Sequence, residues 1–129
     1  MDKNIPFKFV FDYLEPLDVT VKPMFGMFAV YVGEKIMLVL RKRKSEENKN
    51  GVWIACSNDD DVSLRAEFPS LRSIPGLTNK SSETEWQYFP DDADDFETSV
   101  IRICELIVQR DSRIRRVPQN RVPKKKSKR

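Results

Sequence analysis

The chain contains no histidine and has only four glycines and two cysteines. Without an imidazole it cannot build a Ser-His-Asp or Cys-His nucleophilic site, and no histidine can act as a general base. Histidine-containing zinc sites such as HExxH and Cys₂His₂ are excluded for the same reason. The glycines are too widely spaced for GxGxxG, and the sequence holds neither GK[ST] nor GxSxG, which excludes a P-loop and a nucleophile elbow.

The two cysteines are too far apart in the sequence for a CxxC redox or zinc pair. Cys56 and Cys104 each lie within an apolar run, so we predict two buried small hydrophobic side chains, with a cysteine nucleophile as the alternative. Long apolar runs are also missing, because the longest, Met27–Val32 and Ile36–Leu40, are too short for a signal peptide or a transmembrane helix. We therefore expect a cytoplasmic protein with reduced thiols and no contact with a membrane.

Charge is plentiful but unevenly distributed along the 129 residues. The 23 Lys/Arg and 20 Asp/Glu give a net charge of +3. Residues 1–112 carry 14 Lys/Arg and all 20 acidic residues, a net charge of −6, whereas residues 113–129 carry nine Lys/Arg and no acid. A chain of this length suits one domain. We predict a single acidic domain over 1–112 and a flexible, basic C-terminal tail over 113–129.

Apolar periodicity predicts three helices. The apolar residues from Phe7 to Leu14 recur at the spacing of one helix face, which predicts a helix over residues 5–17. Acidic residues precede a short second helix over 62–68, as suits a helix N-terminus. The clearest helix follows Asp94, which forms a variant of the capping box with Glu97, and ends near residue 110.

Segments rich in Val, Ile, Tyr and Phe predict about five strands, placed near residues 19–21, 27–32, 36–41, 52–56 and 85–89. The segment Ile36–Leu40 is apolar at every position, which indicates a central strand covered on both faces. Consecutive strands with short connections favour antiparallel pairing. The expected fold is therefore α+β, with an antiparallel sheet of about five strands flanked by an N-terminal helix, a short middle helix and a long C-terminal helix.

The segment 22–40 begins with Lys-Pro-Met-Phe-Gly and continues through two apolar strands that a Gly33-Glu34 turn connects. It resembles the start of the N-terminal domain of the TfoX family, a bacterial family with Met-Phe-Gly-Gly at the matching turn. Met24, Phe25 and Gly26 match that motif, whereas Met27 replaces its second glycine. The resemblance implies a secretion-chaperone-like α+β fold, a frequent homodimer and no known catalytic residues. The regulator that names the family has a second domain, so its activity does not carry over to this chain.

Two apolar features have a structural and a functional interpretation. In the turn Met24-Phe25-Gly26, the methionine and phenylalanine either enter the core while Gly26 adopts a positive φ, or form a lip that faces a ligand. We expect the first, because apolar residues at strand starts usually pack inward. Similarly, a cluster of aromatic residues could stack on single-stranded nucleic acid. Because Glu85 and four aspartates of 91–95 accompany this cluster, we expect core packing instead for Trp53, Trp86, Tyr88 and Phe89.

The charged runs have similar alternatives. The aspartates of 59–61 and 91–95 could bind Mg²⁺, but exposed acids at helix starts explain both runs, so we predict no metal site. The run Arg41–Lys44 continues a strand into a loop and is expected to be a solvated strand end, or to join the tail in one positive surface.

The tail has three interpretations: a solvating segment without a partner, a contact for nucleic acid without sequence preference, or a segment that folds back on the acidic body or a dimer partner. Because the body is acidic, nucleic-acid binding through the tail would be weak and strongly salt-dependent. The candidate contacts with nucleic acid or an acidic partner are Arg113, Arg115, Arg116, Arg121, Lys124, Lys125, Lys126, Lys128 and Arg129.

The leading functional hypothesis is a non-enzymatic protein-interaction or regulatory module that contacts a protein partner or a second copy of itself. The second is an accessory or regulatory protein that binds nucleic acid weakly through its basic tail. The third is a domain that binds a small molecule in a pocket between sheet and helices. We predict no catalytic residue, no metal and no cofactor.

Overall fold

The computed structural model describes residues 4–57, 60–75 and 84–114. Six antiparallel strands form one sheet in the spatial order β1-β2-β3-β4-β6-β5. The strands are β1 (Val19–Met24), β2 (Met27–Val32), β3 (Lys35–Arg41), β4 (Gly51–Ser57), β5 (Arg72–Ser73) and β6 (Thr84–Pro90). The helices are α1 (Phe9–Tyr13), α2 (Asp61–Glu67) and α3 (Phe96–Val108), with a 3₁₀ turn, η1 (Glu47–Lys49), between β3 and β4. This is the α+β fold that the sequence predicts, including its long C-terminal helix.

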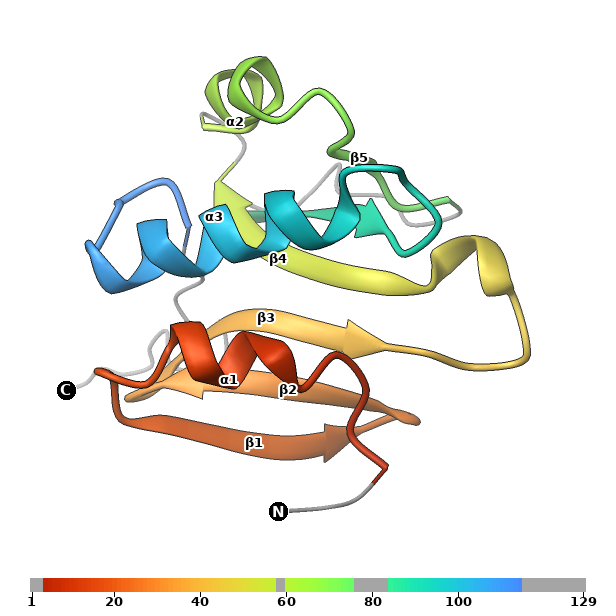
Figure 1. Cartoon of the computed structure of the whole chain (residues 1–129), viewed down its shortest axis with the longest axis horizontal. Coiled ribbons are helices and arrows are strands. Elements are labelled where there is room, and N and C mark those ends of the chain that lie inside the picture. The colour runs from red at the N-terminus through yellow and green to blue at the C-terminus, as the bar shows by residue number, and fades with distance from the viewer. Residues whose placement is uncertain (1–3, 58–59, 76–83, 115–129) are drawn as a thin grey trace, which may run out of the picture.

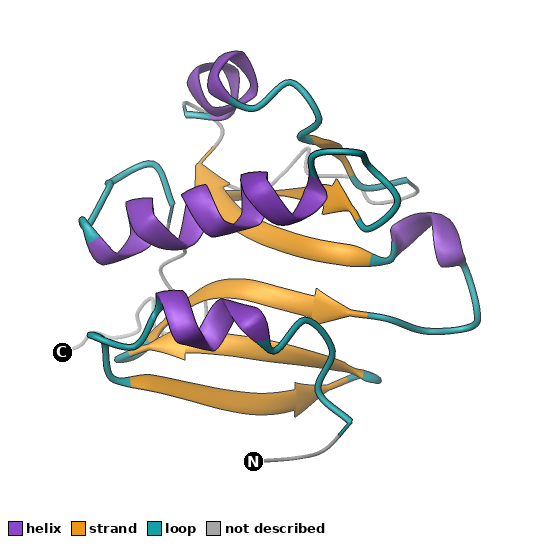
Figure 2. Ribbon diagram, in the orientation of Figure 1, coloured by secondary structure: helices purple, strands orange, loops and turns teal. Residues whose placement is uncertain are grey.

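The helices pack on one face of the sheet, which we call the helix face (Figures 1 and 2). Val10 of α1, Leu64 of α2 and Ile103 of α3 join one buried cluster with strand residues such as Leu38 and Ile54. Side chains of a strand alternate between the two faces. Strand residues therefore alternate between this core and the opposite face. The exception is a register shift between β2 and β3, beside which the consecutive residues Met37 and Leu38 both pack in this cluster.

The central position predicted for the strand at 36–40 is confirmed. β3 is the third of six strands, paired with β2 on one side and β4 on the other. Leu38, Val39 and Leu40 are fully buried, although Val39 belongs to a different apolar cluster from the other two. Both faces of the strand are thus apolar and buried, but α1, α2 and α3 contribute only to the cluster of Leu38 and Leu40.

Three local predictions are corrected. α1 spans five residues rather than the whole of 5–17, because Phe7 has a φ of +57° and its ring packs against Phe96, with centroids 5.2 Å apart. The capping box is wrong, since α3 begins after Asp95 and the N-cap has no side-chain hydrogen bond to the backbone. The sheet also has a sixth strand, β5, which pairs with Tyr88 and Gln87. The sequence does not predict it, because a strand of two residues is too short to show an alternating pattern.

Gly51 fixes the approach of β4 to β6. Its φ is +146°, and a Cβ atom there would lie 2.0 Å from the carbonyl oxygen of Phe89. The amide of Asp91 also donates to the carbonyl of Asn50 at 3.0 Å, directly beside this contact. A glycine is required here because any side chain would push the two strands apart.

Both cysteines are free and buried, as the sequence predicts. Cys104 lies in α3 within the main core, where burial raises the pKa of its thiol to about 12. A thiol with that pKa is almost entirely protonated at neutral pH and therefore a poor nucleophile.

The described chain ends on the body rather than leaving it at residue 112. Ile114 is buried and forms an isolated antiparallel bridge with Cys56 of β4. The guanidinium of Arg113 forms ion pairs with Asp111 at 2.8 Å and with Glu67 of α2 at 2.9 Å, and donates to Ser63 at 2.9 Å. Residues 113 and 114, which the sequence places in the tail, thus pack against the domain.

Candidate functional site

A second apolar cluster lies on the sheet face opposite the helices, and we call this surface the open face. Three of its side chains, Ala29, Ile36 and Val39, are buried, and larger half-buried side chains pack around them. The helices α1, α2 and α3 do not contribute to it, since their core residues belong to the other cluster. The 3₁₀ turn η1 borders one end of it, where the carbonyls of Lys49 and Asn48 accept from the Trp53 indole and the Tyr88 hydroxyl. The cluster consists of Met24, Met27, Ala29, Tyr31, Ile36, Val39, Trp53 and Trp86.

Strand register brings the aromatic residues of the open face together. Trp53 of β4 is paired with Val39 on one side and Tyr88 on the other, and Trp86 is paired with Ala55. The rings of Trp53 and Trp86 lie 6.2 Å apart between centroids, tilted by 60°. The indole N–H of Trp53 donates to the carbonyl of Lys49 at 3.0 Å, which fixes the orientation of its ring against the loop.

The β1–β2 turn adds an exposed aromatic ring at one end of this surface. Met24 and Met27 pair across the turn, which leaves Phe25 and Gly26 as its two central residues. Their φ values are +51° and +79°, as in a type I′ hairpin turn. A phenylalanine in this conformation is strained, and its side chain is 85% exposed. The predicted core position of Phe25 is therefore wrong, whereas the positive φ predicted for Gly26 is confirmed.

The charged strand positions of the open face are positive. Lys22 is paired with Ala29, and its ammonium lies 5.0 Å from the centre of the Tyr31 ring. Arg72 of β5 is paired with Tyr88, which is itself paired with Trp53. Among the six strands, Glu85 is the one acidic residue, and it is paired with Cys56, a residue of the helix-face core.

Arg41, at the end of β3, is a buried cation that only neutral oxygen atoms accompany. It is 3% exposed, so the solvated strand end predicted for 41–44 is wrong at this residue. Its guanidinium donates to the carbonyls of Ser45 and Glu46 at 3.0 and 2.9 Å and to Oδ1 of Asn50 at 2.7 Å. Within the described part of the chain it forms no ion pair, although its charge adds to the effect of Lys49 in lowering the pKa of the Glu46 carboxyl.

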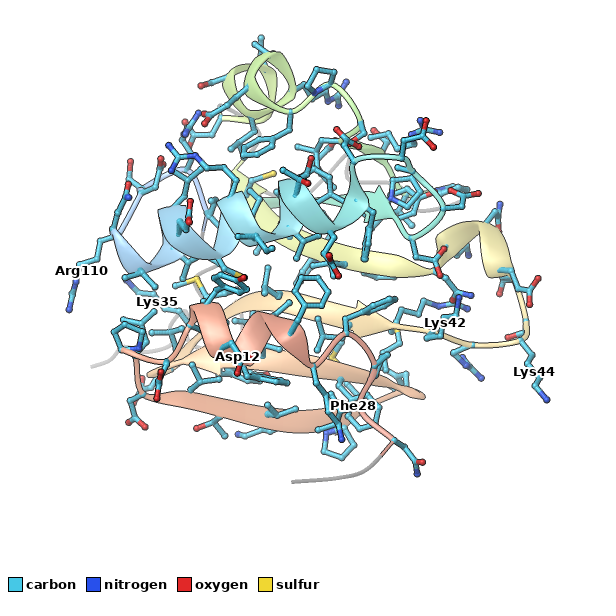
Figure 3. The ribbon with its side chains drawn as sticks, in the orientation of Figure 1. Asp12, Phe28, Lys35, Lys42, Lys44 and Arg110 are labelled. Atoms are coloured by element: carbon cyan, nitrogen blue, oxygen red, sulfur yellow. The ribbon has the colours of Figure 1, made fainter. Side chains whose placement is uncertain are left out.

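Arg43 links the same loop to the β1–β2 turn. Its Nη1 lies 3.4 Å from the carbonyl oxygen of Phe25, and its guanidinium packs over the Cα of Gly26. Its backbone is held by Asn50, which accepts from the amide at 2.9 Å and donates to the carbonyl at 2.8 Å. Lys44 extends into solvent from this loop, at the opposite end of the molecule from Arg110 (Figure 3).

Most of the ion pairs are on the helix side of the molecule. Glu67 and Glu105 pair with Arg102 of α3, and Asp111 and Glu67 pair with Arg113. In the loop after β6, Asp91 pairs with Lys42. The charges are thus segregated: carboxylates and their partners surround the helices, while Lys22, Arg41, Arg43 and Arg72 have no carboxylate partner among the described residues.

The core packing predicted for four aromatic residues is confirmed for two of them. Phe89 is fully buried on the helix face, where its ring lies 5.5 Å from that of Phe68, and Tyr88 is buried with its hydroxyl donating to the carbonyl of Asn48. Trp53 and Trp86 are instead half-buried on the open face. The alternation of side chains along a strand could have predicted which face each ring occupies. In the paired strands β4 and β6, positions 53, 86 and 88 lie on one face of the sheet and position 89 lies on the other.

Other candidate sites gain no support as binding sites. No group of three or more metal-binding side chains is found among the described residues. Asp59 and eight of the nine basic tail residues lie outside them: Arg115, Arg116, Arg121, Lys124, Lys125, Lys126, Lys128 and Arg129. Arg113 is described, and it contacts acidic residues of the body, as one of the three interpretations of the tail expects. In the part of the chain that the structure covers, no helix has the length and apolar character to span a membrane.

Comparisons with known proteins give no match from which a function could be inferred. No family model, no curated protein and no solved structure matches the chain. The resemblance of Met24-Phe25-Gly26 and its flanking strands to the TfoX N-terminal domain therefore stays a prediction.

Proposed function

We propose that the chain is a non-catalytic binding module, and that the open face is its docking surface for an anionic partner. The observation that carries this proposal is the meeting of half-exposed aromatic rings and unpaired cations on a sheet face without strand carboxylates. A domain that binds a partner without catalysing a reaction suits a regulatory role, which is the leading hypothesis from the sequence.

The composition of the open face supports docking. Tryptophan, tyrosine, methionine and arginine are enriched in the energetically important centres of interfaces. Large half-buried side chains that pack on each other and on smaller buried ones, as Trp53 does with Trp86 and Val39, provide contact area that is already ordered. Ordering costs at binding are therefore low, which favours affinity.

Two alternatives to this proposal have less support. A catalytic role could use neither an imidazole nor an accessible thiol, since the chain has no histidine and both cysteines are buried. A homodimer seated on the open face would bring Lys22 and Arg72 of two copies toward one another, which is unfavourable without carboxylates there. An anionic partner satisfies both the rings and the cations.

Paired charge reversals in the full chain test this proposal. Lys22→Glu with Arg72→Glu reverses two cations of the open face, and Lys8→Glu with Lys35→Glu reverses two cations away from it at the same net charge. The open-face variant should elute from heparin at lower salt than the matched variant, because both retain the same tail. Equal elution of the two variants would overturn the proposal.

A further inference from the structure

We infer that the anionic partner of the open face is a single-stranded nucleic acid, whose bases stack on the exposed ring of Phe25 and on the half-buried aromatic rings beside it, while its phosphates contact the flanking cations. This inference rests on the proposed function and names the partner of that same surface. It arises from three features of the described chain: the layout of the rings, the position of the cations and the distance of the acids.

The rings form an aromatic surface that spans several strands. Tyr31, Trp53 and Trp86 come from β2, β4 and β6, so they are spread across the strands, and Phe25 stands at the end of the β1–β2 hairpin. Aromatic side chains on such a surface stack on successive unpaired bases with little sequence preference, because every base has a π-face. A duplex keeps its bases stacked inside, and a broad sheet face does not fit a groove about 12 Å wide.

The cations lie where a backbone would pass beside those rings. Lys22 sits over Tyr31, Arg43 contacts the carbonyl of Phe25, and Arg72 is in register with Tyr88 on the far side of the tryptophans. Arginine suits this place because its planar guanidinium binds phosphate and also stacks on bases. The buried charge of Arg41 adds positive potential below the loop without being accessible itself.

Most of the ion-paired acidic residues lie away from this contact. The exceptions border one end of the open face: Asp92 and Asp91 add to the effect of burial in raising the pKa of Tyr88, and Asp91 is paired with Lys42. The sequence alone argues that a body with a net charge of −6 repels phosphates, but most of the ion-paired acids lie around the helices, behind the sheet. These acids lie on the other side of the sheet from the open face, and exposed charges are screened beyond about 8 Å at physiological salt. In the bordering loop, Glu46 is paired with Lys49 at 2.6 Å.

An acidic peptide would meet the same cations and is the main competing partner. It would use the apolar surface without requiring several aromatic rings on neighbouring strands. The tail is the other competitor, since its basic residues bind polyanions without involving the open face.

Intrinsic fluorescence distinguishes these partners, because the chain has two tryptophans and both lie on the open face. The full chain is titrated with an oligothymidylate of about 12 nucleotides, with a duplex of the same length, with heparin and with polyglutamate. Oligothymidylate should quench the emission strongly and bind more tightly than the duplex. Phe25→Ala should weaken its binding about fivefold or more by removing one stacking ring.

The cation contacts have their own readout in the salt dependence. Lys22→Ala with Arg72→Ala should reduce the slope of log K against log salt by about 1.4, the value for two lost phosphate contacts on a single strand. The matched Lys8→Ala with Lys35→Ala should leave the slope unchanged.

Quenching by heparin or polyglutamate but not by oligothymidylate would overturn the inference and leave the proposed function standing. Oligothymidylate binding without quenching, abolished by deleting residues 115–129, would assign the contact to the tail and overturn it as well. If no polyanion changed the emission, and if the binding of none depended on Lys22 and Arg72, both the inference and the proposed function would fail.

Discussion

The indole rings of Trp53 and Trp86, from the adjacent strands β4 and β6, lie 6.2 Å apart on the sheet face that the described helices leave uncovered. Cations without carboxylate partners flank this pair, with Lys22 and Arg43 toward β1 and Arg72 on β5. We therefore expect a positive local potential around the two rings, even though residues 1–112 carry a net charge of −6.

Charged quenchers should report this potential directly. The ratio of quenching by iodide to quenching by caesium should be higher for the tryptophans of the folded chain than for free N-acetyltryptophanamide. The reason is that anions concentrate at a positive surface. The excess should decrease as ionic strength rises. A folded protein in which caesium is the better quencher would show that the open face is not positive.

The exposed ring of Phe25 in the β1–β2 turn should lower the stability of the fold. Phe25→Asn should raise the free energy of unfolding by about 1 kcal/mol, since Asn-Gly is the favoured pair in a type I′ turn and the left-handed conformation strains phenylalanine. Phe25→Ala keeps the strain and should give no comparable gain. Urea denaturation measures both, and a loss of stability in Phe25→Asn would show that the ring contributes to folding.

Two glycines with positive φ should respond very differently to alanine. Gly51→Ala should cost about 3 kcal/mol or more, because the new Cβ would lie 2.0 Å from a backbone oxygen of Phe89. Gly26→Ala should cost about 1–2 kcal/mol, the strain of the left-handed region, because its neighbour is the movable end of Arg43. Equal losses in urea denaturation would contradict the close approach of β4 and β6.

The contact of Arg113 with the body should depend on pH. Hydrogen bonds from Arg113 hold the pKa of Asp111 below its ordinary value, so this carboxylate stabilises the fold above about pH 3.9 and loses its contribution as pH falls through the lower, folded pKa. Asp111→Asn should lower the free energy of unfolding by about 1 kcal/mol at neutral pH. The difference from the unmodified chain should shrink below about pH 3.9.

Asp12→Asn is the matched control, because Asp12 is exposed on α1 and has no ion pair within the described residues (Figure 3). It removes the same charge and should leave stability nearly unchanged. If the two substitutions behaved alike, the ion pairs of Arg113 would not hold the end of the described chain on the domain.

The sequence predicts the elements of this fold well where apolar residues recur over many positions. The long helix at 96–108 and the central strand at 36–40 have such patterns, and both are confirmed. The first helix is shorter than predicted because a tertiary contact between Phe7 and Phe96 determines the backbone before it. β5 has two residues, and its pairing with β6 depends on the rest of the sheet.

The candidate surface was harder to predict because it depends on which side of the sheet each charge occupies. Net charge along the chain suggests an acidic body, while the register places Lys22 and Arg72 with the rings. Among the ion-paired acidic residues of the described chain, three lie in the helices or directly after α3: Glu67, Glu105 and Asp111. Arg41 could not be recognised as buried from a run of four basic residues. Its burial depends on Asn50 and the carbonyls of the loop that folds around it.

The most direct test of the account is photocrosslinking of a single-stranded oligonucleotide containing 5-bromouracil to the full chain, with the adducts located by mass spectrometry. We predict adducts at Phe25, Tyr31, Trp53 and Trp86, the rings of the open face and its turn. Adducts confined to residues 115–129, or to α1, α2 and α3, would contradict it.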